Sequence, residues 1–168
     1  MISFEDFLNI PPYSLAEKDK EQLLTERLIH LTKVHQEKCP EYRKMLGAIG
    51  FNINTVRTYQ DLPFLPVRLF KELELRSVPP DAVVKTMTSS GTTGQAVSKI
   101  FLDRETASNQ QKAMVKIVSS FTGSSRMPMI IIDCPSVIKN RAMFSARGAG
   151  IWAFQSSALK RYMPLMMR

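Results

Sequence analysis

Cysteine is scarce in this chain of 168 residues, which contains only Cys39 and Cys134. Two cysteines this far apart give neither the spacing of a metal site nor the framework of a disulfide-rich secreted domain. Long apolar runs are missing as well, since the longest, MPMIII at 127–132, is much too short to cross a bilayer. No signal-peptide pattern opens the chain, so we expect a soluble, cytoplasmic protein with reduced thiols and no membrane span.

Acidic residues are fewer than basic ones. The chain has 15 Asp and Glu and 23 Lys and Arg, which gives a formal net charge of +8. Such an excess suits an anionic small ligand or a polyanion. The basic residues are scattered and no run of them is interleaved with aromatic residues, which disfavours nucleic-acid binding. With 44% apolar residues, the composition is that of an ordinary globular protein.

The amino-terminal part has the periodicity of helices. Leu24, Leu28, Leu31 and His35 recur at steps of three and four residues and predict an amphipathic helix over 17–38, with this stripe packed on a core. A shorter helix is expected after Pro40, ending at Gly47 or Gly50.

Four prolines limit the secondary structure of the next segment and indicate where the first portion of the chain ends. Pro63 and Pro66 exclude a continuous helix there, and Pro66 suits the start of a short one. The apolar side chains of this segment are expected to be buried: Leu62, Phe64, Leu65, Leu69 and Phe70. The pair Pro79–Pro80 predicts a division into a helical portion, 1–80, and an α/β portion, 81–168.

The second portion alternates strand and helix patterns. Strands are expected over 81–88 and 97–103, followed by a helix with Asp103 as its N-cap and then by a strand at 127–133 that is buried on both faces. The order strand, helix, strand predicts a mainly parallel sheet with crossover helices, and therefore the α/β class.

The first two of these strands flank the sequence SSGTTG at 89–94. Its two glycines, Gly91 and Gly94, allow the backbone to approach a ligand closely, and its N–H groups and hydroxyls are donors for an anion. Lys99 could add a positive charge. The composition is equally typical of a plain hairpin turn, and the residues alone leave both interpretations open. A Walker-type loop is excluded, because QAVSK follows Gly94 where that motif requires Lys and then Ser or Thr.

The stretch SSGTTGQAVSK resembles the phosphate-binding motif of the adenylate-forming enzymes, the superfamily of acyl-CoA synthetases, peptide synthetase adenylation domains and firefly luciferase. It departs from the usual motif by a doubled serine, a missing proline and a lysine two places later. With these departures, the stretch resembles the motif of the branch that contains the phenylacetate-CoA ligases and the LuxE-type acyl-protein synthetases. The stretches LPFLPVRLFKE, FLDRETASNQQKAM, RMPMIIIDCPS and FSARGAGI look closest to the LuxE type.

The resemblance implies the first part of an adenylate-forming fold, with the carboxyl-terminal half of the adenylation domain lacking. It implies ATP-dependent activation of a carboxylic acid, as in enzymes acting on fatty acids, and acyl transfer to a thiol of a protein or of coenzyme A, with ATP and Mg²⁺ as cofactors. The phosphate loop carried over is Ser89, Ser90, Gly91, Thr92, Thr93 and Gly94, together with Lys99.

Outside the loop, Arg147 and Gly148 are candidates for a substrate pocket, although a helix end or a surface position is the more ordinary place for Arg147. No catalytic residue and no metal ligand is assigned. We expect the isolated chain to show little ligase activity and to self-associate through an open sheet edge. Three alternatives stay open: an enzyme like phenylacetate-CoA ligase, a non-catalytic binding module of the same fold, and a nucleic-acid binder, which would show a steep salt dependence.

Overall fold

The computed structural model describes residues 2–89, 96–123, 127–133, 143–145 and 158–162 and the single positions 125, 148, 150, 151 and 154. The chain forms two compact units, Met1–Pro79 and Pro80–Arg168. The predicted helix over 17–38 and the predicted strands on either side of the SSGTTG sequence are confirmed. None of the helices in the described ranges is long and apolar enough to cross a membrane.

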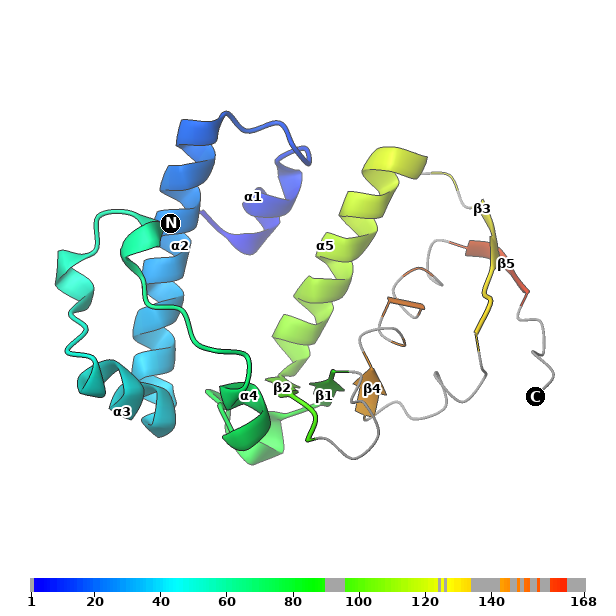
Figure 1. Cartoon of the computed structure of the whole chain (residues 1–168). Coiled ribbons are helices and arrows are strands. Elements are labelled where there is room, and N and C mark those ends of the chain that lie inside the picture. Colours follow the sequence, from blue (N-terminus) through cyan, green and yellow to red (C-terminus); the bar gives the residue numbers. More distant parts are fainter. Residues whose placement is uncertain are drawn as a thin grey trace. The chain divides into compact units, whose positions relative to one another are not determined.

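The first unit is helical (Figure 1). Its helices are α1 (Phe4–Asn9), α2 (Glu17–Lys38), α3 (Pro40–Ala48) and α4 (Leu69–Glu72), with short 3₁₀ turns at Ile53–Thr55 and Tyr59–Asp61. The chain turns sharply between α2 and α3 because Cys39 is extended and Pro40 occupies the first position of α3. Arg43 then donates from Nε to the Gln36 carbonyl at 2.8 Å, which satisfies one of the acceptors that the end of α2 leaves free.

The core of the first unit lies where α3 meets α2. Leu46 is fully buried and Cys39 is 2% exposed, and Val56 from the following segment is buried as well. The helix α3 ends before Gly50, whose φ of +63° is the left-handed conformation that favours glycine at this position. The expected glycine stop is therefore confirmed, at Gly50.

The predicted apolar stripe of α2 is only partly correct. Leu28 and Leu31 are half-buried, but Leu24 is 41% exposed and His35 is also exposed, while the buried residue of the helix is Thr32. The reason is that α2 contacts short elements, α3 and the two 3₁₀ turns, which cover separate spots of its surface and not one continuous face.

The prediction that the apolar side chains of residues 62–70 are buried is wrong for one aromatic residue. Phe64 is 91% exposed, whereas Leu62, Leu65, Leu69 and Phe70 are half-buried. The prolines keep residues 62–65 out of a helix, so the burial of each side chain depends on which neighbouring segments cover it, and Phe64 is left uncovered. The short helix α4 begins at Leu69, three residues after the proline expected to start it.

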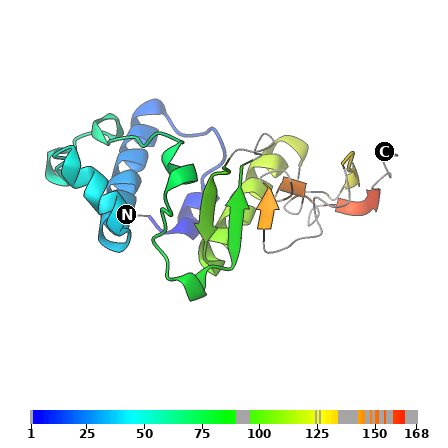
Figure 2. The ribbon, with the colours of Figure 1, turned by 60° about the horizontal axis from the view of Figure 1, so that its bottom comes forward.

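The second unit contains two sheets. Strand β1 (Lys85–Thr88) pairs antiparallel with β2 (Lys99–Leu102) and parallel with β4 (Met143–Ser145), and these three lie side by side in Figure 2. A separate pair joins β3 (Met127–Ile130) to β5 (Ala158–Tyr162) in parallel. Helix and strand are mixed as expected for the α/β class, but the described residues do not show a parallel sheet with crossover helices.

Helix α5 (Arg104–Thr122) lies between β2 and β3 in the chain. Its expected N-cap is confirmed, since Asp103 accepts a hydrogen bond from the Thr106 N–H at 2.7 Å. Burial of β3 on both faces is not observed, because Ile130 and Ile132 are each 69% exposed while Ile131 between them is 6% exposed. Alternation along an extended chain explains this pattern, with only one face covered.

The burial difference between Leu46 and Phe64 predicts opposite outcomes for the same kind of truncation. Leu46→Ala should lower the free energy of unfolding by about 2–5 kcal/mol, because it removes a fully buried side chain and leaves a cavity. Phe64→Ala, the matched control, should change it by less than about 0.5 kcal/mol. Urea unfolding followed by circular dichroism measures both, and equal losses in the two variants would contradict the described packing.

Candidate functional site

The candidate anion-binding sequence lies on the β1–β2 hairpin. The register pairs Lys85 with Leu102 and Thr88 with Lys99, so the four residue pairs of the two strands are aligned without a bulge. The hairpin is extended at its loop end, where the Ser89 N–H donates to the Ser98 carbonyl at 3.2 Å. The Ser98 N–H donates in turn to the Ser89 Oγ at 3.0 Å. The backbone and the side chain of Ser89 thus both bind the backbone of Ser98, and these two bonds join the two arms of the hairpin at the loop.

The structure describes only the two edges of the predicted phosphate loop. Ser89 is exposed and ends the first arm of the hairpin, and Lys99 is exposed at the start of β2. The remaining loop residues lie outside the described residues: Ser90, Gly91, Thr92, Thr93 and Gly94. Arg147 also lies outside them, whereas Gly148 is helical and buried. Their assignment to a phosphate site or a substrate pocket stays a prediction.

Strand alternation separates the polar groups at the loop edge into two sets. Thr88 and Lys99 are cross-strand partners and share one face of the hairpin. Ser89 and Ser98, the next pair toward the loop, belong to the opposite face. A ligand held against one face would therefore meet short hydroxyl side chains, and against the other a threonine and a flexible ammonium group.

Ser98 is a polar residue of this site that the sequence reasoning missed. It is 8% exposed, and its Oγ has no hydrogen-bond partner in the described part of the chain. Buried hydroxyl groups are nearly always hydrogen-bonded, so this one needs an explanation. The signal in the sequence is a single serine between Val97 and Lys99, directly before β2.

Lys85, at the other end of β1, is a second group that the sequence did not single out. Partial burial lowers the pKa of its ammonium group. The hairpin thus carries one lysine at each end, and it is Lys99 that lies beside the loop. Hydroxyl, N–H and ammonium groups are all donors, and this donor set fits the oxygens of a polyphosphate such as that of ATP.

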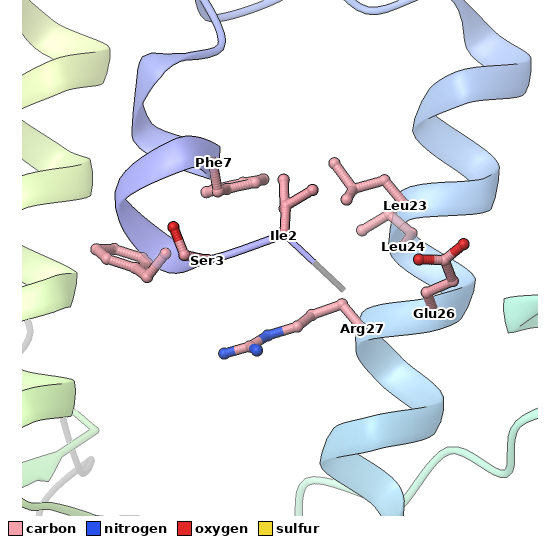
Figure 3. A pocket seen from close by; sticks show the side chains of 8 residues that line it. Ile2, Ser3, Phe7, Leu23, Leu24, Glu26 and Arg27 are labelled. Atoms are coloured by element: carbon pink, nitrogen blue, oxygen red, sulfur yellow. The ribbon is translucent and has the colours of Figure 1, made fainter.

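The first unit contains a hollow of about 190 Å³ between α1 and α2 (Figure 3). Its walls are mainly apolar and come from the chain start and from one side of α2: Ile2, Phe4, Phe7, Leu23 and Leu24, with Ser3, Glu26 and Arg27. In Figure 3 the guanidinium of Arg27 extends toward α1. Ligand pockets usually measure ~300–1,000 Å³, so this hollow suits a small apolar group and not a nucleotide.

A polar cluster ties the end of α2 to the segment before the second unit. The His35 Nδ1 and the Ser77 Oγ are 2.7 Å apart, and the ring of Tyr42 meets that of His35 edge to face, with centroids 6.5 Å apart. Although the residue as a whole stays exposed, partial desolvation of the ring, and then the positive charge of Lys38, lower the pKa of His35. The neutral imidazole is therefore the favoured form in the folded protein.

The helical first unit and the hairpin of the second define a mixed α/β protein with a candidate anion-binding loop. The sequence model of the acyl-protein synthetase LuxE family matches residues 3–153, which cover most of both units. The chain therefore belongs to the LuxE acyl-protein synthetase family, a family of ligases. The predicted resemblance is confirmed by this match. No curated protein matches the chain.

The His35 cluster predicts a pH dependence of stability. Because folding lowers the pKa of His35, the unfolded chain binds more protons, and stability should fall as the pH drops below 6.5 until the folded pKa is passed. His35→Gln should remove this slope, and His30→Gln, which changes the only other histidine, should retain it. Unfolding free energies measured between about pH 5 and 7.5 test this. An unchanged slope in His35→Gln would refute it.

Proposed function

We propose that this protein takes part in the ATP-dependent activation of a carboxylic acid as its acyl-adenylate, followed by transfer of the acyl group to a thiol. Membership of the LuxE acyl-protein synthetase family over residues 3–153 is the observation that carries this proposal. The β1–β2 hairpin supports it, since donors gather at its loop end. The proposed fold is the adenylate-forming one, with a mainly parallel sheet and crossover helices.

The loop at 89–94 is proposed to hold the phosphates of ATP. Bound Mg·ATP supplies an electrophilic α-phosphorus and pyrophosphate as the leaving group. The backbone N–H groups and the hydroxyls of Thr92 and Thr93 would donate to phosphate oxygens, and in a site shielded from water such fixed donors stabilise developing negative charge. Lys99, on its flexible stem, would add positive charge from the other face of the hairpin.

A fatty acid is the proposed acid, and the acceptor is proposed to be a thiol outside this chain. Cys39 is a poor acceptor because it is 2% exposed, in the core between α2 and α3, where an acyl donor does not reach its sulfur. Cys134 lies outside the described residues. A protein cysteine, as the family name implies, or coenzyme A would then take the acyl group.

The proposal is tested by carboxylate-dependent exchange of pyrophosphate into ATP, measured with a panel of aliphatic and aromatic acids. The protein as its gene encodes it is assayed beside the 168-residue chain. The protein should exchange with a long-chain acid, and Thr92→Ala should lower the rate about tenfold or more, since one hydrogen bond to a charged group is lost. Lys99→Ala should also lower it, with an effect that shrinks at high salt because the group is exposed.

Ser108→Ala is the matched control, because Ser108 is exposed on α5 and away from the loop sequence. Exchange with aromatic acids alone would favour an enzyme like phenylacetate-CoA ligase. Binding of ATP without exchange would favour a non-catalytic module. A folded protein that neither binds ATP nor exchanges would overturn the proposed function.

A further inference from the structure

The hollow between α1 and α2 is open to a small molecule (Figure 3). Its volume of about 190 Å³ is of the same order as that of an apolar cavity of ~150 Å³, engineered into another protein, that binds benzene. Three of its apolar walls are accessible to solvent, since Ile2, Phe7 and Leu24 are each 40–46% exposed. A hydrocarbon group that covers these side chains removes apolar surface from water, which favours its binding.

Three polar residues also line the hollow, and one of them suits an anionic ligand. The Ser3 hydroxyl caps α1, because it donates to the Asp6 carboxylate at 2.7 Å and accepts from the Asp6 N–H at 3.1 Å. The Glu26 carboxylate accepts from the Gln22 Nε2 at 3.1 Å. Arg27 is exposed, and its guanidinium extends from α2 toward α1. This planar fork of donors matches the geometry of a carboxylate.

We propose that the hollow binds a small carboxylic acid, with its hydrocarbon group between α1 and α2 and its carboxylate at the Arg27 guanidinium. The family of acyl-protein synthetases works on acids, so this class of ligand is one that the chain meets. The inference goes beyond the proposed function, because binding here requires neither ATP nor the loop at 89–94. Every residue that lines the hollow lies within 2–27.

Titration of the 168-residue chain with hexanoate and with hexanol, both without ATP, tests the inference. Proton–nitrogen NMR spectra of the amides report affinity and location together, and the shifted amides should be those of residues 2–9 and 23–27. Leu24→Gln should weaken both ligands about tenfold, because an apolar wall is lost. Leu73→Gln is the matched control, since Leu73 is 39% exposed and lies outside the hollow, and it should bind as the wild type does.

Charge variants separate the carboxylate from the hydrocarbon group. Arg27→Gln should weaken hexanoate about tenfold at low salt and less at high salt, and should leave hexanol unchanged, because only the acid is charged. Lys33→Gln, which removes the same charge from an exposed position of α2 outside the hollow, should retain wild-type affinity for both. Glu26→Gln should strengthen hexanoate alone, because it removes a like charge from the lining.

Four results would overturn the inference: no binding of either ligand, hexanoate-dependent shifts at amides away from the hollow, unchanged hexanoate affinity in Arg27→Gln, or equal losses of hexanoate and hexanol in that variant. Shifts of the same amides on dilution of the free chain would assign the hollow to a second copy and exclude the acid. Both Leu24 and Arg27 are exposed, so their variants should fold, and circular dichroism checks this. Pyrophosphate exchange is measured separately, so the proposed function survives a failure here.

Discussion

The antiparallel register of β1 with β2 is the constraint on which the candidate site depends. It aligns Thr88 with Lys99 and places Ser89 opposite Ser98, where two hydrogen bonds join the two serines. The chain between these serines must therefore begin and finish at the same end of the hairpin. The same register decides which side chains share a face, because a shift by one residue would exchange the two faces. The chemistry available to a ligand follows from that alignment.

The first unit depends on a different constraint, the break between α2 and α3. Proline at the start of α3 and an extended Cys39 turn the chain, so that Leu46 is buried where α3 meets α2. Arg43 covers carbonyls at the end of α2, and the Tyr59 N–H donates to the Thr25 Oγ1 at 3.0 Å, which fastens the following segment to the same helix. Local backbone chemistry and a small apolar core thus build this unit together.

Family membership and hairpin geometry bear on function in different ways. The match identifies the chain as a member of a family of acyl-protein synthetases, and it extends over most of both units. The hairpin adds the arrangement of donors, with a buried serine on one face and an exposed lysine on the other. Among the described residues, the small hollow beside α1 and α2 belongs to the first unit and has the size for an apolar group. It carries none of the donors gathered at the hairpin.

The sequence by itself determined the local elements: the helix over 17–38, a glycine stop after the next helix, the cap at Asp103 and both arms of the hairpin. Capping, proline geometry and periodicity act over a few residues, so they can be read without the fold. Only the tertiary structure decided that Phe64 and Ile130 are exposed and that Ser98 is buried with an unsatisfied hydroxyl. Burial depends on which distant segments cover a side chain, and a residue's own neighbours in the sequence do not specify that.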